Sequence, residues 1–237
     1  MMEMEQCPQC HIPGRRKTFA RYEDGHGYCF YCSFYEKGNF VKMMDNRSER
    51  QGLMPIPRDA TTTVTGAGMD WLRKYELTRV DTLYHNIMWS EATKLLIFPF
   101  YADEVLLAWQ ARDFKDNPKT KWFSQGNLRE LFCILGNHPE REVVLVEDIV
   151  SAIKVSRYKN ALCLFGSSPP DDVLARIKTF YDKAYVWLDA DAQDKAMKAC
   201  RTLEKMGVKS TPLFTQQDPK EHTYAQLEYI FKSKEYE

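Results

Sequence analysis

Apolar and polar positions follow two different periods along the second half of this 237-residue chain. Short aliphatic stretches predict four strands, at 143–146, 161–165, 184–188 and 211–215. Stretches with apolar residues at helical spacing predict four helices, at 149–158, 170–180, 192–206 and 222–232. Strands that alternate with helices of roughly 10 to 15 residues are typical of βαβ units. The pattern therefore predicts an α/β fold with a parallel sheet.

The middle of the chain has a different pattern, in which predicted strands follow one another closely. A short amphipathic stretch predicts a helix at 69–77, and apolar or alternating stretches predict strands at 95–101, 105–114 and 120–123. Only three residues separate the first two strands, and the turn at 115–118 separates the last two. Short connections favour antiparallel pairing, so we expect an α+β subdomain built on a meander.

The first 40 residues are rich in cysteine, glycine, histidine and aromatic residues and poor in aliphatic ones. They cannot build an apolar core and need another source of stability. The next segment is polar and contains Pro55 and Pro57, which predicts a mobile linker. We therefore expect a small N-terminal β domain at 1–40, the linker at 41–62, the mixed subdomain at 63–139 and the parallel-sheet domain at 140–237.

Composition narrows the possible functions. The chain has 33 basic and 33 acidic residues, which argues against a coat protein that binds nucleic acid by global charge. A hydrophobic content of 44% and a charged content of 28% exclude wholesale disorder. The longest apolar run, 95–102, is too short to span a bilayer, and the N-terminus lacks the apolar core of a secretory signal. We expect a cytoplasmic protein without a membrane partner, whose seven cysteines are thiols or metal ligands.

Four cysteines form two Cys-x-x-Cys pairs, Cys7 with Cys10 and Cys29 with Cys32, separated by 18 residues. Each pair can place two thiolates on one ion, and two pairs complete a closed tetrahedral zinc site. Because protein fills all four positions, we expect one structural zinc ion rather than a catalytic one. A redox role would instead place one such pair at the start of a helix. The remaining cysteines are expected to be core thiols, namely Cys133, Cys163 and Cys200.

The cysteine-rich segment also interleaves basic and aromatic residues. The basic strip is Arg15, Arg16, Lys17 and Arg21, and the aromatic residues are Tyr28, Phe30, Tyr31, Phe34 and Tyr35. This combination suits single-stranded nucleic acid, because cations meet phosphates and bases stack on rings. The rings could equally form the small core around zinc. His26 is a candidate for contact with a base, and both His26 and His11 are alternative zinc ligands.

Three acidic residues follow predicted strands of the parallel sheet. Glu147 comes directly after the strand at 143–146, and Asp189 and Asp191 follow the strand at 184–188. Ligands gather at the carboxyl ends of parallel strands, and residues two apart can leave a strand on one side. Clustered carboxylates need a hard cation such as Mg²⁺, so the set predicts a site that acts on phosphates. Asp218 is a fourth candidate, whereas a lone Asp after a strand would indicate a helix N-cap.

The order of these features and several short stretches together carry a family resemblance. The stretches are Asp24-Gly-His-Gly-Tyr-Cys29-Phe-Tyr-Cys32, Trp71-Leu-Arg-Lys-Tyr, Leu96-Ile-Phe-Pro, Trp109-Gln-Ala-Arg112 and Lys121-Trp-Phe-Ser-Gln-Gly126. With the four cysteines and the strand-Glu and strand-Asp-x-Asp motifs, the chain resembles the TOPRIM-containing DNA primases of bacteria and phages. It is most similar to the primase half of phage primase-helicases, and the resemblance covers nearly the whole chain.

The resemblance implies a nucleotidyltransferase that makes short RNA primers on single-stranded DNA from ribonucleoside triphosphates for DNA replication. Glu147, Asp189 and Asp191 would be TOPRIM acids that hold one or two Mg²⁺ or Mn²⁺ ions, with Asp218 as a further catalytic acid. The 1–40 region would be a zinc ribbon that reads the template. The residues expected to bind nucleotide or template are Arg112, Lys119, Lys121, His26, Arg15, Arg16 and Lys17. Gln110 and Arg112 are two apart in a predicted strand and therefore share a face.

Two features separate the chain from its relatives. The family usually follows the first Glu with Gly and places an Asp four residues after the Glu, whereas Asp148 and Ser151 stand at these positions here. The chain also has no Gly-Lys-Ser/Thr phosphate loop, so it carries no helicase motor. We therefore expect a separate helicase or polymerase as partner, in the host cytoplasm if the protein is encoded by a phage.

Two other functions combine similar parts. A recombination mediator joins a zinc finger to a TOPRIM domain without catalysis, but a helix-hairpin-helix precedes its finger, and Cys7 leaves no room for one here. A TOPRIM nuclease or a topoisomerase fragment is the second alternative. A topoisomerase would need a catalytic tyrosine in a further domain, which 237 residues do not accommodate.

Overall fold

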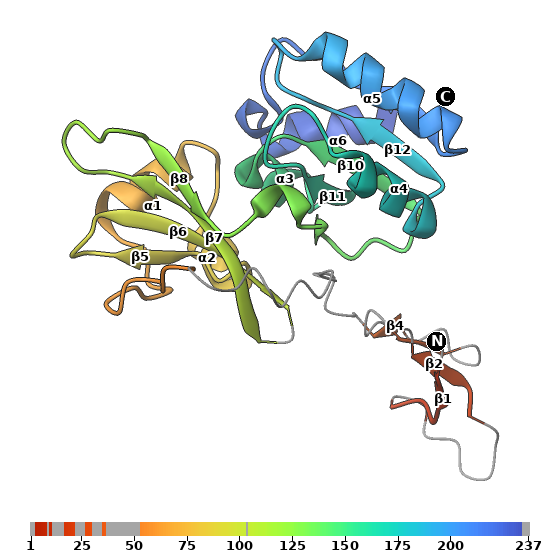
Figure 1. Cartoon of the computed structure of the whole chain (residues 1–237), viewed down its shortest axis with the longest axis horizontal. Helices are drawn as coiled ribbons and strands as arrows, with labels where there is room; N and C mark the ends of the chain where they lie inside the picture. The colour runs from red at the N-terminus through yellow and green to blue at the C-terminus, as the bar shows by residue number, and fades with distance from the viewer. Residues whose placement is uncertain are drawn as a thin grey trace.

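The computed structural model describes residues 3–8, 10, 17–21, 27–29, 35–36, 53–102 and 104–233. These residues form three sheets, of four, five and four strands (Figure 1). We call them the ribbon sheet, the parallel-rich sheet and the meander sheet, respectively; along the chain, the meander sheet comes before the parallel-rich sheet. Within the described residues, no helix combines the length and the apolarity needed to cross a bilayer.

The parallel-rich sheet has the strand order β13-β12-β10-β11-β9. Its strands are β9 (Cys133–Leu135), β10 (Glu142–Val146), β11 (Asn160–Cys163), β12 (Lys183–Val186) and β13 (Lys209–Pro212). β10 pairs in parallel with both β11 and β12, and β12 pairs in parallel with β13. β9 is antiparallel to β11 at one edge, a strand that the periodicity did not predict. The expected α/β fold is confirmed.

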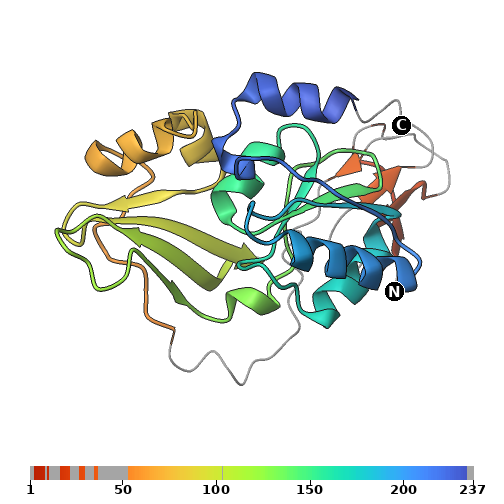
Figure 2. The same ribbon diagram turned by 90° about the horizontal axis from the view of Figure 1, so that it is seen from above.

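Helices cover both faces of this sheet, α3 (Ile149–Val155) and α6 (Tyr224–Ser233) on one and α4 (Asp171–Phe180) and α5 (Gln193–Lys205) on the other (Figure 2). Alternate residues of β10 therefore enter two different cores. Val144 and Val146 pack in the core with α3 and α6, whereas Val143 and Leu145 pack in the core with α4 and α5. This arrangement explains why the strand is apolar from Val143 to Val146, since both of its faces are covered there.

The meander sheet is antiparallel, as expected, in the order β5-β6-β7-β8. Its strands are β5 (Met88–Ser90), β6 (Leu95–Ala102), β7 (Val105–Asp113) and β8 (Trp122–Gln125). In place of the single predicted helix at 69–77 there are two, α1 (Gly66–Arg73) and α2 (Arg79–Tyr84). The chain turns between them at Glu76, which has a φ of 59°, and α2 begins with a capping box between Thr78 and Asp81.

The second half of the predicted mobile linker packs on the outer face of the meander sheet. Leu53 and Ile56 contact an apolar cluster that includes Ile97 and Trp109. The indole N–H of Trp109 also donates a hydrogen bond to the carbonyl of Met54 at 2.8 Å. The linker prediction is therefore wrong for 53–62, because this face of the sheet is apolar and needs cover. The first part of the predicted linker, 41–52, lies outside the described residues.

Buried and charged contacts join the meander sheet and its helices to the parallel-rich sheet. One apolar core runs from Leu72 and Phe98 to Val144 and Phe231. Around it, Arg157 of the α3–β11 connection pairs with Asp81 of α2 at 2.6 Å. The two regions are thus fixed to each other, and the cavity between them has a defined shape.

The ribbon sheet consists of four short antiparallel strands. They are β1 (Glu3–Glu5), β2 (Phe19–Arg21), β3 (Gly27–Cys29) and β4 (Tyr35–Glu36). Among its described residues, Phe19 is buried and packs against Cys7 and Cys29.

Candidate active site and metal centres

A cavity of about 360 Å³ lies where the meander sheet meets the carboxyl ends of the parallel strands. Glu147 and Asp148 enter it directly after β10, and Asp189 enters it after β12. Gln110 and Arg112 of β7 line the opposite side. Open α/β sheets bind ligands at this edge. The cavity therefore places acids from one sheet opposite polar and basic groups from the other.

Glu147 and Asp189 are in direct contact. The backbone N–H of Asp189 donates to Glu147 Oε1 at 3.1 Å, although the two residues are 42 positions apart. Burial raises the pKa of Glu147, and burial followed by the charges of Asp218, Asp148 and Glu147 raises the pKa of Asp189 to about 7, against the opposite influence of Lys220. Asp189 Oδ1 is buried and has no hydrogen-bond partner among the described residues. A buried acceptor without a partner is costly unless a cation satisfies it.

Lys220, in the loop after β13, extends its side chain toward Asp148, Asp189 and Asp218. Its Nζ lies 3.0 Å from Asp218 Oδ2, 3.2 Å from Asp148 Oδ2 and 3.7 Å from Asp189 Oδ2. Burial disfavours its charge, but the three carboxylates outweigh burial and raise the pKa of Lys220 above its ordinary value. The ammonium group therefore remains charged in the cluster.

Arg112 is held by aromatic rings on the other side of the cavity. Its guanidinium carbon lies 4.7 Å from the ring centre of Trp71, 5.5 Å from that of Phe114 and 5.7 Å from that of Trp122. Burial lowers the pKa of Arg112, and its Nε is buried without a hydrogen-bond partner among the described residues. Rings fix a guanidinium by cation–π contacts while leaving its N–H groups available to a ligand.

The ribbon brings three of the four predicted zinc ligands together. The sulfur atoms of Cys7, Cys10 and Cys29 lie within 4.8 Å of one another, with Cys10 Sγ and Cys29 Sγ at 3.9 Å. The backbone N–H of Cys10 donates to Cys7 Sγ at 3.5 Å, a contact that stabilises a thiolate. Three converging sulfur atoms fit a zinc site. Cys32, the expected fourth ligand, lies outside the described residues.

No family model matches the sequence, and no curated protein matches it. Several solved structures are similar to this chain, and two of them align over almost its whole length. The zinc-binding and RNA polymerase domains of the Aquifex aeolicus primase align with a TM-score of 0.59 at 14% identity, over 98% of this chain and 78% of that one. The primase fragment of the bacteriophage T7 primase-helicase protein aligns with a TM-score of 0.52 at 13% identity, over 97% of each chain. The chain has the fold of these primase domains.

Within this primase fold, the predicted acids differ in position. Glu147 and Asp189 line the cavity, and Asp218 contacts Lys220 beside them. Asp191 is exposed and does not line the cavity, although its charge raises the pKa of Glu147. β12 ends at Val186, so the strand period no longer applies to Asp189 and Asp191. The strand period therefore does not place Asp191, and its role in the site stays a prediction.

The predicted basic residues of the primase core also differ in whether they line the cavity. Gln110 and Arg112 share the face of β7 that lines the cavity, as expected. Lys119 and Lys121, on the connection between β7 and β8, are exposed and do not line it. Their roles remain predictions.

Other predicted site residues belong to the ribbon. Lys17 is exposed just before β2, whereas Arg15, Arg16, His11 and His26 lie outside the described residues. The three remaining cysteines, Cys133, Cys163 and Cys200, are buried, as expected of core thiols. Burial raises the pKa of Cys133 to about 12, so this thiol stays protonated.

Several residues that line the cavity were not among the sequence-based candidates, among them Lys220, Tyr75 and Trp122. The stretch Asp218-Pro-Lys-Glu221 places Lys220 two residues after a candidate acid, which is a signal that the sequence offers for it. Tyr75 and Trp122 lie in the stretches that carry the resemblance, yet only the fold reveals that they line the cavity. Aromatic residues in a sequence give no signal that distinguishes a core ring from one that lines a site.

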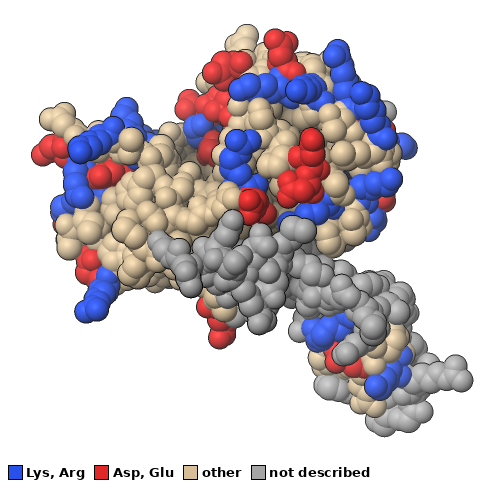
Figure 3. All heavy atoms as spheres, in the orientation of Figure 1, with Lys and Arg blue, Asp and Glu red and all other residues tan. Residues whose placement is uncertain are grey.

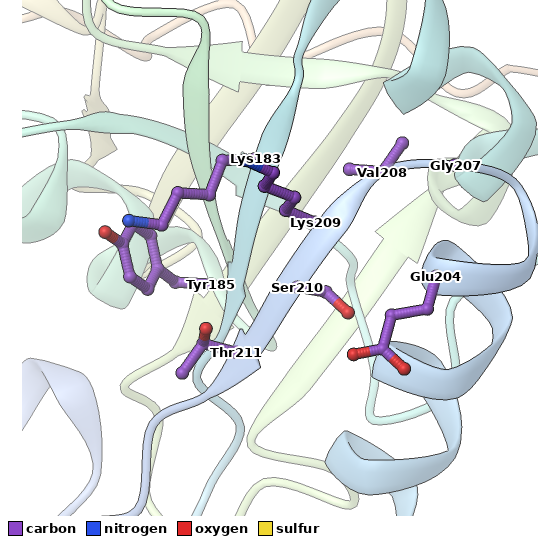
Figure 4. A pocket seen from close by; sticks show the side chains of 8 residues that line it. All are labelled: Lys183, Tyr185, Glu204, Gly207, Val208, Lys209, Ser210 and Thr211. Carbon is purple, nitrogen blue, oxygen red and sulfur yellow. The ribbon is translucent and has the colours of Figure 1, made fainter. Parts of the chain in front are cut away.

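A second and larger cavity, of about 590 Å³, lies at the edge strand β13 (Figure 4). Lys183, Tyr185 and Lys209 line it with Glu204 of α5. Lys183 already pairs with Glu142 at 3.6 Å and lies over the ring of Tyr185 at 4.7 Å. None of the acids that follow β10 or β12 lines this cavity, so the smaller cavity is the candidate active site.

Proposed function

We propose that this protein is a DNA primase that makes short RNA primers on single-stranded DNA from ribonucleoside triphosphates. The observation that carries the proposal is the cavity in which Glu147 and Asp189 face Arg112, within a primase fold. Acids that can hold a cation and a guanidinium that can hold a phosphate are the two requirements of nucleotidyl transfer.

Glu147 and Asp189 fit a divalent cation best. Both present carboxylate oxygens at the carboxyl ends of neighbouring strands, and Asp189 Oδ1 is buried without a partner among the described residues. Oxygen donors of this kind suit Mg²⁺ or Mn²⁺. Such an ion, when bound, lowers the cost of forming the attacking 3′-oxyanion and stabilises the leaving pyrophosphate. Asp191 and Asp218 would complete the acidic surroundings.

Arg112 would bind the triphosphate of an incoming nucleotide. The three rings around its guanidinium hold it in place, so little conformational entropy is lost when a phosphate binds. Gln110, on the same face of β7, can donate a further hydrogen bond from its amide. These groups lie across the cavity from the acids, so a triphosphate bound to them can extend toward the carboxylates.

The ribbon would hold the template. A zinc ion on Cys7, Cys10, Cys29 and Cys32 would fix its strands, and basic residues such as Lys17 would meet the DNA phosphates. Lys119 and Lys121 would contact template or nucleotide outside the cavity. A separate helicase or polymerase would supply the strand and extend the primer.

Incubation with single-stranded DNA, labelled ribonucleotides and Mg²⁺ tests the proposal. The wild-type protein is expected to make short RNA products, and Asp189→Asn and Glu147→Gln are expected to lower the rate at least about 100-fold, because each removes a charge that holds the ion. Lys198→Met, an exposed change on α5, is the control and should retain the wild-type rate. RNA synthesis at the wild-type rate by Asp189→Asn contradicts the proposal. Cleavage of the DNA indicates a nuclease instead, and binding alone indicates a mediator.

A further inference from the structure

Lys220 lies within a cluster of three carboxylates, at a position where a metal ion would be expected. Its Nζ lies within 3.0 to 3.7 Å of oxygen atoms from Asp148, Asp189 and Asp218. These residues belong to three segments, which follow β10, β12 and β13. One ammonium group therefore neutralises acids that the fold assembles from three strand ends.

The surrounding structure fixes the position of Lys220. It is the middle residue of a short 3₁₀ helix, η3 (Pro219–Glu221), and its side chain is only 19% exposed. Beneath it, Lys154 of α3 is buried and donates to the backbone carbonyls of Lys220, at 3.0 Å, and His222. Glu76, in the connection between α1 and α2, lies 3.7 Å from Lys154 Nζ. Lys154 therefore also links the loop of Lys220 to the helices beside the meander sheet. Because Lys154 fixes the backbone at positions 220 and 222, the side chain of Lys220 has few directions available other than into the carboxylate cluster.

With Lys220 among them, these acids are spaced for an ammonium group rather than for a second divalent ion. Mg²⁺ needs oxygen atoms at about 2.1 Å, so its ligands must converge. Among the residues that the structure describes, no three acids bring their oxygen atoms within 4.8 Å of one another, whereas three cysteines do bring their sulfur atoms that close.

Asp148 is also engaged elsewhere. Its Oδ1 accepts from the N–H groups of Val150 and Ser151 at the start of α3, and its Oδ2 accepts from the hydroxyl of Ser151 at 2.8 Å. Ser151 therefore turns toward Asp148 and offers no charge of its own to the cluster. Asp189 Oδ1, which is buried and has no partner among the residues that the structure describes, is distinct from the Oδ2 atom that lies near Lys220.

We propose that the ammonium group of Lys220 takes one cation position of the carboxylate cluster, so that the protein binds a single divalent ion there. That ion would be held by Glu147 and by the Oδ1 side of Asp189. The inference rests on the proposed function, because it specifies the metal content of the same site. It assigns to a protein side chain a positive charge that a second ion would otherwise supply.

Titration of the zinc-loaded full-length protein with Mn²⁺, followed by electron paramagnetic resonance, measures the number of ions directly. Wild-type protein is expected to bind one Mn²⁺ per chain. Lys220→Met is expected to bind two, since the acids around position 220 then have no ammonium group between them and can converge on an ion. Lys220→Arg keeps the charge and should bind one. Lys198→Met removes an exposed lysine of α5 and should also bind one.

The outcomes separate this inference from the proposed function. Two Mn²⁺ ions bound by the wild-type protein overturn the inference without any variant, so a Lys220→Met protein that fails to fold does not prevent the test. One ion bound by both wild type and Lys220→Met also overturns it, while loss of that ion in Asp189→Asn leaves the proposed function intact. If the wild-type protein binds no Mn²⁺ and makes no RNA, both fail together.

Discussion

Asp148 and Asp189 both follow strands of the parallel-rich sheet, yet they use their carboxylates differently. Asp148 caps α3, with its Oδ1 bound to two backbone N–H groups. α5 begins at Gln193, four positions after Asp189, and its N-cap is Ala192. Asp189 therefore does not cap a helix. The N-cap interpretation that competes with metal binding applies to the first aspartate and not to the second.

Arg112 illustrates how one side chain depends on its surroundings in the cavity. Arg112→Lys keeps the charge but loses the planar group that stacks on Trp71. The loss of about 1 to 2 kcal/mol of cation–π and bidentate contact is expected to raise the KM for ribonucleotides about tenfold, with a smaller change in kcat. Initial rates of primer synthesis measure both constants. Arg73→Lys on the exposed side of α1 is the matched control, and equal KM values for the two variants contradict the assignment.

Asp81 links the stability of the protein to pH. It is buried and accepts hydrogen bonds from Arg157 at 2.6 Å and from the backbone N–H of Thr78 at 2.7 Å. Burial alone would raise the pKa of Asp81, but these hydrogen bonds outweigh burial and lower it. Because the folded-state pKa lies below the unfolded value, the stabilisation is complete above about pH 4 and is lost as the pH falls through the folded-state pKa.

Asp81→Asn is therefore expected to lower the free energy of unfolding by about 2 kcal/mol at pH 7, because it removes the charged acceptor of the hydrogen bonds from Arg157 and Thr78. The difference from wild type should shrink when urea unfolding is repeated at pH 3 and below. Asp70→Asn, an exposed change with one surface ion pair, should alter stability by less than about 1 kcal/mol at either pH. A difference that does not depend on pH would show that the charge of Asp81 contributes nothing.

At the scale of elements, α3 connects the structural and the functional parts of the molecule. Asp148, which lines the cavity, caps the N-terminus of α3, and the buried Lys154 of α3 donates to the backbone of the loop that carries Lys220. The connection that follows α3 places Arg157 on Asp81 of α2. One short helix thus contacts the acid cluster, the loop after β13 and the meander region. This explains why a helix of only seven residues is buried along its whole length.

The ribbon is the element whose fold depends most on one residue type. Cys29→Ser is expected to reduce the zinc content from about one ion per chain to none, because a hydroxyl is a poor substitute for a thiolate. Loss of the ion should unfold the ribbon sheet and abolish initiation at preferred template positions, while the other two sheets remain folded. Colorimetric zinc release and mapping of primer 5′ ends measure the two effects. Cys200→Ser, at an isolated buried thiol, should keep its zinc; full zinc content in Cys29→Ser would falsify the ligand assignment.

At the scale of the whole molecule, a formal net charge of zero is compatible with a protein that handles nucleic acid. On the face shown in Figure 3, acidic and basic side chains occur side by side on the described surface. In the cavity the same balance appears on a small scale, with Arg112 and Lys220 near Glu147, Asp148 and Asp189. The net charge therefore does not indicate whether the protein binds nucleic acid, whereas the local arrangement of charged side chains does.

The sequence by itself determined the alternation of strands and helices, the antiparallel meander, the cysteine pairs and the acids after β10 and β12. These features are local or periodic, so a linear pattern carries them. Only the tertiary structure decided that Asp189 enters the cavity while Asp191 remains exposed, and that 53–62 packs on the meander sheet. It also decided that Lys220 lies among Asp148, Asp189 and Asp218. Such contacts join residues up to 72 positions apart, and their free energy depends on burial and distance, which no local pattern encodes.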